Sequence, residues 1–242
     1  MRKHRFFVNE NLEINTNINL DSDISQHISR VLRLQTSDVI YLFNDSGLEF
    51  SATIESINKN SVLVNITDVS AESYTAPLQI NLGQVLSKGE KMDLIIQKAT
   101  ELGVHSITPL YSERSIIKPV HDRANSKLEH WQKIAIAASC QSWRNTVPEI
   151  YAAQNLSEWV EANQDPYKLL LSPHHSSQKI SNLDMKNTVT ILIGPEGGFS
   201  EAEVNDAMQH NFMPIALGPR ILRTETAGLA TIAILQAMFG DL

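Results

Sequence analysis

The sequence contains almost no cysteine: Cys140 is the only one among 242 residues. A single cysteine cannot form an intrachain disulfide, so the chain is not a small secreted scaffold held together by such bridges. Its first residues are basic but lack the apolar stretch that a secretory signal needs. We therefore expect a protein of the reducing cytoplasm.

Long apolar runs are also missing. The longest, Leu229–Phe239, is about half the ~20 residues that a membrane-spanning helix requires, and Gln236 interrupts it. Zinc-ligand patterns are missing too, because the adjacent His174 and His175 have no cysteine or histidine at ligand spacing. The sequence therefore predicts neither a membrane span nor a metal site.

Basic residues are outnumbered, with 20 Lys and Arg against 27 Asp and Glu, for a net charge of -7. This balance excludes a protein that coats nucleic acid through a broadly basic surface. An RNA partner must therefore meet local patches. The candidate RNA-binding residues, each with a solvated surface as the alternative, are Arg2, Lys3, Arg5, Arg30, Arg33 and Arg114.

The first ~70 residues contain short alternating apolar runs separated by polar turns, which predicts β-structure. One helix is expected within it, over Asp21–Leu34, where Ile24, Ile28 and Val31 contribute to an apolar stripe. This pattern is typical of a small β-barrel. We predict a first domain over residues 1–72.

A polar linker ends at Pro77, and from Leu78 onward apolar runs alternate with helical segments, which is typical of an α/β fold. Runs without strict alternation, such as Thr190–Ile193, suit strands of a parallel sheet that is buried on both faces. The final helix is expected within Arg223–Phe239, with Thr224 or Thr226 as its cap. We predict a second domain over residues 73–242.

The stretch ILIGPEGGFSEAEV places a glycine-rich turn between a strand and a helix. Ser200 and Glu203 form a capping-box pattern, so the helix begins near Ser200. A phosphate-binding loop would need Lys and then Ser or Thr after its glycines, and the spacing also fails to match a dinucleotide fingerprint. Taken alone, the turn is explained equally well by a ligand or by the need for glycine between two elements.

A second glycine-proline turn, at Gly218 and Pro219, follows the next apolar run. Both turns are expected at the same edge of the sheet, the edge where open α/β folds bind ligands. Ile221 and Leu222 lie there beside free amides and two arginines. This combination suits a ligand with an aromatic part and several hydrogen-bonding groups.

Together, the stretches IGPEGGFSEAE and LGPRILRTETA resemble the signature of the SPOUT methyltransferases. More narrowly, they resemble the RsmE family, which methylates N3 of a uridine in small-subunit (16S) ribosomal RNA. HISRVLRL, DLIIQKATELGV and CQSWRNTVPEI extend the similarity over nearly the whole chain. The sequence departs from the family pattern at Cys140, where an acidic residue is usual, and at Trp143, where a small one is usual.

The resemblance implies an α/β fold: a C-terminal SPOUT domain with a parallel sheet and a trefoil knot, preceded by a PUA-like β-barrel that helps to hold RNA. It also implies a homodimer that uses S-adenosyl-L-methionine. A SPOUT enzyme that acts on a tRNA base or a ribose 2'-hydroxyl stays an alternative, as does a noncatalytic ribosome-assembly factor.

The resemblance also assigns the cofactor to three loops, with core packing as the alternative for the aliphatic members. The residues expected to contact it are Leu171, Ser172, Ile193, Gly194, Pro195, Glu196, Gly197, Gly198, Leu217, Gly218, Ile221, Leu222, Arg223, Thr226 and Ala227.

Methylation of uracil N3 requires loss of a proton, and the resulting negative charge spreads onto two carbonyl oxygens. A cation near those oxygens would stabilise it. Arg223 is the leading catalytic candidate and Arg144 the next, although either could bind phosphate or form an ion pair. Glu225 is a candidate base, with the helix macrodipole as the alternative explanation for a glutamate at that position, and Glu196 and Glu101 are weaker alternatives as the base. Positioning alone would suffice if the imide ionises on binding.

Overall fold

The computed structural model describes residues 3–70, 76–115, 121–175, 180 and 187–242. It contains two compact units. The first comprises Met1–Thr75 and Ser139–Val147, and the second comprises Ala76–Ala138 and Pro148–Leu242. The predicted RNA contact Arg2 and the predicted domain boundary at residues 72 and 73 lie outside the described residues.

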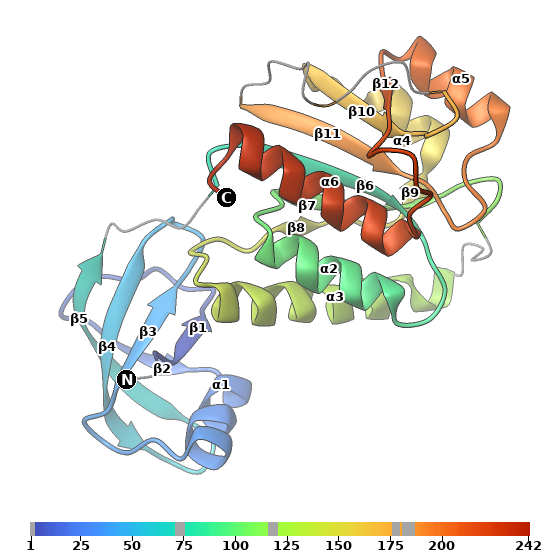
Figure 1. The fold of residues 1–242 in the computed structure, drawn as a ribbon. Coiled ribbons are helices and arrows are strands. Elements are labelled where there is room, and N and C mark those ends of the chain that lie inside the picture. The colour runs from blue at the N-terminus through green and yellow to red at the C-terminus, as the bar shows by residue number, and fades with distance from the viewer. Residues whose placement is uncertain (1–2, 71–75, 116–120, 176–179, 181–186) are drawn as a thin grey trace. The chain divides into compact units, whose positions relative to one another are not determined.

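The first unit is built on a five-stranded sheet in the order β1-β3-β4-β5-β2 (Figure 1). Its strands are β1 Arg5–Phe7, β2 Asn17–Leu20, β3 Val39–Phe43, β4 Glu49–Ile57 and β5 Val62–Ser70. The pairing of β1 with β3 is parallel and the other pairings are antiparallel. Strand β2 was not predicted, because only Ile18 and Leu20 in it are buried and the other two residues are asparagines.

The predicted single helix is instead two short segments, α1 Ser22–Gln26 and a π-helix, η1 His27–Leu32. It begins where expected, because the Asp21 side chain accepts a 2.8 Å hydrogen bond from the amide of Ile24. It ends at Arg33, whose φ of 55° lies in the left-handed region. Hydrophobic periodicity cannot distinguish a π-helical turn from an α-helical one of similar length, so the change of helix type went unpredicted.

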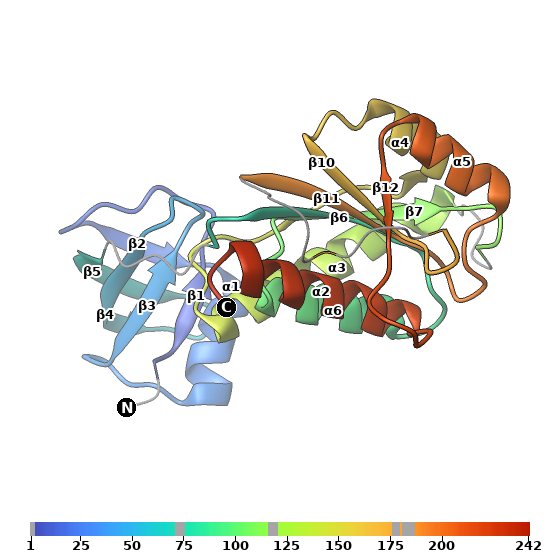
Figure 2. The ribbon, with the colours of Figure 1, turned by 45° about the horizontal axis from the view of Figure 1, so that its top comes forward.

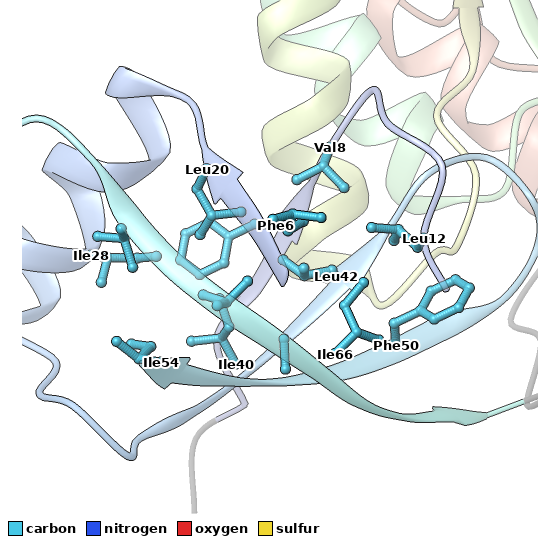
Figure 3. Close-up of a cluster of buried hydrophobic side chains, with 14 residues drawn as sticks. Phe6, Val8, Leu12, Leu20, Ile28, Ile40, Leu42, Phe50, Ile54 and Ile66 are labelled. Carbon is cyan, nitrogen blue, oxygen red and sulfur yellow. The ribbon is translucent and has the colours of Figure 1, made fainter. Parts of the chain in front are cut away.

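Apolar side chains from every strand of this sheet meet in one core. Figure 3 shows Phe6, Ile40, Leu42, Ile54 and Ile66 in that cluster. Ile28 of η1 is fully buried in the same cluster, and its burial anchors the helical segment to the sheet. The prediction of a PUA-like β-sheet unit is confirmed, as a curled open sheet with β1 and β2 at its edges.

The second unit is built on a parallel sheet in the order β12-β10-β11-β6-β7-β8, with β9 also paired to β7. Its strands are β6 Gln79–Val85, β7 Ser106–Tyr111, β8 Glu149–Ile150, β9 Gln154–Asn155, β10 Tyr167–Leu171, β11 Thr188–Ile193 and β12 Met213–Ile215. Strand β11 lies inside the sheet, and all its residues after Thr188 are buried, as a run without alternation predicted.

Helices cover both faces of this sheet (Figures 1 and 2). On one face, α2 Lys91–Glu101 packs against α6 Thr224–Phe239; on the other, α4 Leu156–Ala162 packs against α5 Glu201–Gln209. The longest helix is α3, His121–Ser142. The α/β prediction is confirmed, while the trefoil knot stays a prediction.

Two helices of the second unit differ from the predictions. Helix α4 was not predicted. Helix α6 begins at Thr224, and its N-cap is Arg223, whose side chain makes no capping bond, rather than a threonine. The Thr224 hydroxyl is used elsewhere, as described below. Within the described ranges, no helix combines the length and apolar character that a membrane crossing requires.

Candidate functional site

A cavity of about 570 Å³ lies at the carboxyl ends of β10, β11 and β12. Its size is in the range of roughly 300–1,000 Å³ that is usual for small-molecule sites. The lining residues are Arg114, Leu171, Ser172, Pro173, His174, His175, Ile193, Gly194, Pro195, Glu196, Gly197, Gly198, Phe199, Glu201, Leu217, Arg220, Ile221, Leu222, Arg223, Thr224 and Ala227. The two glycine turns therefore meet at one cavity.

Most residues expected to contact the cofactor line this cavity. The exceptions are Gly218 and Thr226. Gly218 is exposed, and its φ of 102° lets the chain bend after β12. Thr226 is exposed on α6. For these two residues a direct cofactor contact stays a prediction that the cavity does not support.

We call Gly194–Phe199 the first turn. It closes with a 2.9 Å hydrogen bond from the amide of Gly198 to the carbonyl oxygen of Pro195, and the φ of Gly198 is 66°. At Gly194 the constraint is space rather than φ, because an added Cβ would lie 2.9 Å from the Phe199 ring. The predicted capping box follows directly: Ser200 and Glu203 exchange both hydrogen bonds at the start of α5.

We call Leu217–Arg223 the second turn. It is joined to the first by the residue that follows it, because Thr224 Oγ1 donates a 2.6 Å hydrogen bond to the carbonyl oxygen of Gly194. The same hydroxyl accepts a 3.0 Å bond from Nε2 of the buried Gln84 on β6. This chain of bonds fixes the start of α6 against the sheet.

Charged groups beside the cavity form a small network. Lys91 Nζ lies 2.8 Å from Glu196 Oε1 and 3.5 Å from Glu225 Oε2. Partial burial acts to raise the pKa of Glu196, but its hydrogen bonds to Lys91 and the backbone and the charges of Lys91 and Lys88 together lower it. The hydrogen bond to Glu196 and the nearby carboxylates raise the pKa of Lys91. The candidate base Glu225 therefore has a cation beside it but does not itself line the cavity.

The arginines of the cavity differ in how they are held. Arg114 Nη1 lies 3.2 Å from the carbonyl oxygens of both Gly197 and Phe199, so this predicted RNA contact supports the wall of the first turn. Arg220 and Arg223 are exposed at the other side of the lining, on the second turn. Of the three, Arg223 lies closest in sequence to the start of α6.

The remaining predicted residues fall in the first unit. Arg144 is 5% exposed and is not among the cavity-lining residues, so its catalytic role stays a prediction that the cavity does not support. Arg5 is 6% exposed; it bonds to Glu49 Oε2 at 2.7 Å and to the carbonyl oxygens of Ser139 and Arg144. A guanidinium that is buried and bonded in this way is poorly available to RNA phosphate.

The other basic residues of the first unit are more accessible. Arg30 and Arg33 are exposed on η1 and at its end. Lys3 is partly buried: it pairs with Glu49 at 3.3 Å and lies over the rings of Tyr41 and Trp143. The exposed pair on η1 is therefore the better-placed basic patch of this unit.

Several lining residues were missed by the sequence reasoning. Two of them, His175 and Glu201, form with the predicted Ser172 a chain of hydrogen bonds that we call the relay. Ser172 Oγ lies 2.9 Å from His175 Nδ1, and His175 Nε2 lies 3.0 Å from Glu201 Oε2. The relay fixes the turn after β10 to the first residue of α5. His175 follows the predicted contact Ser172 by three residues. Side chains at that spacing in a turn can contact each other, and this was the available signal for His175. The other missed residues are Pro173, His174, Phe199, Arg220 and Thr224.

His174 and His175 lie in a turn, as expected. Across the described residues, no group of three or more His, Cys, Asp or Glu side chains is placed to hold a metal ion. The donors around the cavity are instead backbone groups, hydroxyls and arginines, which suit an organic ligand.

Comparison with known proteins places this geometry in a family. Residues 75–236 match the family described as RNA methyltransferase domain, and residues 20–67 match the RNA methyltransferase PUA domain. The ribosomal RNA small subunit methyltransferase E of Buchnera aphidicola (from Schizaphis graminum) is 40% identical over 240 residues, which cover 98% of this chain and 97% of that protein.

Two solved structures superpose over their full length and that of this chain. A putative methyltransferase from Legionella pneumophila, in complex with the cofactor SAM, has a TM-score of 0.96 and 37% identity. A ribosomal RNA small subunit methyltransferase E from Neisseria gonorrhoeae, bound to S-adenosyl methionine, has a TM-score of 0.94 and 35% identity. The chain therefore belongs to the RsmE family of ribosomal RNA methyltransferases, which use S-adenosylmethionine.

Proposed function

We propose that this protein methylates N3 of a uridine in small-subunit (16S) ribosomal RNA, with S-adenosylmethionine held in the cavity between the two glycine turns. The observation that carries the proposal is the cavity itself. It brings the first turn, the second turn and the exposed Arg223 together at one edge of a parallel sheet. The lining contains both apolar side chains and arginines, which suit a methyl donor and an anionic base.

The lining residues fit the cofactor. Ile193 and Leu217 offer apolar contact to an adenine ring, and the first turn offers backbone groups to its edge. A Cβ added at Gly198 would meet no atom within 4 Å, so the space beside this turn is open to a ligand. When bound, S-adenosylmethionine supplies a methyl group activated by its sulfonium.

Arg223 is the proposed electrostatic catalyst. It is exposed at the N-cap of α6, and its side chain makes no capping bond. The positive end of the helix dipole lies at the same position. A uracil ring placed there would have a cation near its carbonyl oxygens as N3 loses its proton, which lowers the barrier for proton loss.

Glu225 is the proposed base. Its side chain is 14% exposed, and its Oε2 lies 3.5 Å from Lys91 Nζ. Among the described residues, this buried oxygen makes no regular hydrogen bond, and its contact with Lys91 is an ion pair. Since Glu225 does not line the cavity, its carboxylate would have to reach the base by a side-chain rotation or through a water molecule.

We propose that Arg30 and Arg33 of the first unit contact RNA phosphate, together with Arg114 at the cavity. This assignment rests on their exposure and charge. Arg5 is left out because its guanidinium is committed to Glu49 and to backbone carbonyls. The uridine must be unpaired or flipped for N3 to be reached.

We also propose that the protein is a homodimer. The proposal rests on the family resemblance, and the exposed Ile221 on the second turn and Met238 on α6 are candidates for burial in such a dimer. Sedimentation equilibrium of the purified protein tests the proposal. A monomer at micromolar concentration would contradict it.

The decisive experiment for the proposed function has three parts. Calorimetry measures binding of S-adenosylhomocysteine. Incubation of small-subunit RNA with labelled S-adenosylmethionine, followed by nucleoside mapping, identifies the methylated atom. Arg223→Ala is expected to keep the fold and lose turnover, while the matched control Lys98→Ala, on α2, keeps both. A methyl group on a ribose or a tRNA base would replace the proposed acceptor.

A further inference from the structure

Lys91 occupies an electrostatically unfavourable position. It is the first residue of α2, so its ammonium group lies near the positive end of that helix dipole. Its Nζ also lies beside Glu225, the second residue of α6, and therefore near a second helix N-terminus. A lysine that serves solubility alone is more favourable at the C-terminal end of a helix, where the dipole is negative. Negatively charged partners are therefore required to explain Lys91 at this position.

The partners are two carboxylates from segments far apart in the chain. Glu196 lies in the first turn, and its Oε1 is 2.8 Å from Lys91 Nζ. Glu225 lies two residues after the end of the second turn, and its Oε2 is 3.5 Å from Lys91 Nζ. One cation therefore links three segments: the start of α2, the first turn and the start of α6.

This link is the outer of two that join the glycine turns. The inner one is the hydrogen bond from the buried Thr224 to the carbonyl oxygen of Gly194. The side chains of Lys91 and Glu196 are 32% and 34% exposed, so their bond lies at the surface side of the same junction. Arg114 holds the far end of the first turn through the carbonyl oxygens of Gly197 and Phe199, and the Lys91 contact at Glu196 lies between that anchor and the inner bond.

We propose that Lys91 is a positioning residue that holds the two glycine turns at the spacing the methyl donor requires. It touches neither donor nor RNA in this assignment and acts through Glu196 and Glu225. The inference deepens the proposed function and rests on it for the identity of the ligand.

The test compares Lys91→Met, which keeps the aliphatic length and removes the charge, with Lys91→Arg, which restores a cation. Lys98→Met is the matched control, because Lys98 lies on the same helix and pairs at 2.8 Å with Glu101, away from both turns. Glu196→Gln provides a second variant that weakens the link without altering α2.

Two measurements are made on each variant. Hydrogen exchange of the ligand-free protein is expected to become faster at amides of both turns in Lys91→Met and Glu196→Gln, and to stay as in the wild type in Lys91→Arg and Lys98→Met. The dissociation constant of S-adenosylhomocysteine is expected to rise roughly two- to fivefold in the first two variants, the range that a partly exposed ion pair supports.

Equal exchange and equal affinity in Lys91→Met and Lys98→Met would overturn the inference, and so would failure of Lys91→Arg to restore the wild-type values. These results are separable from failure of the proposed function. A wild-type protein that does not bind S-adenosylhomocysteine contradicts the function, while the exchange measurement on the ligand-free protein still decides whether Lys91 holds the turns.

Discussion

The hydroxyl of Thr224 donates a 2.6 Å hydrogen bond to the backbone carbonyl oxygen of Gly194. The bond joins the first residue of α6 to the first residue of the turn after β11, and Gln84 supports it from β6. A residue expected to cap its own helix thus connects the two turns that form the cavity.

Thr224→Val keeps the shape of this side chain and removes the hydroxyl. Gln84 and the Gly194 carbonyl would each lose a partner, so we expect a loss of about 1–3 kcal/mol of unfolding free energy and weaker binding of S-adenosylhomocysteine. Urea denaturation and calorimetry measure the two effects. Thr226→Val, on the exposed side of α6, is the control and should change neither. Equal stability of the two variants would contradict the assigned role.

Alanine substitutions at two glycines of the first turn are expected to destabilise the protein for different reasons. Gly198→Ala places a Cβ on a residue with φ of 66° and should cost about 1–2 kcal/mol through backbone strain. Gly194→Ala places a Cβ 2.9 Å from the Phe199 ring, so its cost is steric. Adding Phe199→Leu should therefore recover stability for Gly194→Ala and not for Gly198→Ala. Recovery in both, measured by thermal or chemical denaturation, would refute this distinction.

Arg5 is predicted to stabilise the first unit rather than to bind RNA. Arg5→Met leaves the largely buried Glu49 with only its 3.3 Å contact to Lys3, and we expect a loss of roughly 3–5 kcal/mol. The double variant Arg5→Met with Glu49→Gln should regain part of that loss, because the uncompensated charge is gone. Arg30→Ala, at an exposed position, should change stability by less than about 0.5 kcal/mol. Denaturation curves of the four proteins give the answer.

The Glu196 carboxyl makes the stability of the second unit depend on pH. Its pKa is lowered from the ordinary value of 4.5, so its contribution is present above 4.5 and is lost as the pH falls through the lower folded-state value. The pKa of Lys91 is raised from 10.5, so its share is present below 10.5 and is lost above that. The stability difference between wild type and Glu196→Gln should therefore be largest between these values and disappear in acid. A difference that grows in acid would have the wrong sign.

The relay from Ser172 through His175 to Glu201 is predicted to hold the loop after β10 against the cavity. His175→Ala removes both contacts, at 2.9 and 3.0 Å, and should weaken S-adenosylhomocysteine binding with little change in stability, because the ring is partly exposed. Glu201→Gln should have a smaller effect in the same direction. His210→Ala, at the far end of α5, serves as the control for both.

Local sequence rules were sufficient for most elements. The apolar run Thr190–Ile193 lies within β11, and the capping box at Ser200 marked the start of α5, because hydrophobic patterns and helix caps act over a few neighbouring residues. Short elements with weak periodicity, such as β2 and α4, escaped notice. Their few apolar residues are buried only because they pack against cores formed by other segments of the chain.

The family signature drew attention to both glycine turns, and strand order explains why they meet: β10, β11 and β12 are adjacent and parallel, so the loops after them share one edge. Tertiary structure alone decided the long-range partners. The sequence alone does not show that the Arg5 guanidinium binds Glu49 and backbone carbonyl oxygens. Nor does it show that Thr224 donates a hydrogen bond to Gly194, or that Lys91 pairs with Glu196. Such pairings depend on which side chains the packed sheet and helices bring within about 3 Å, and no local pattern encodes that distance.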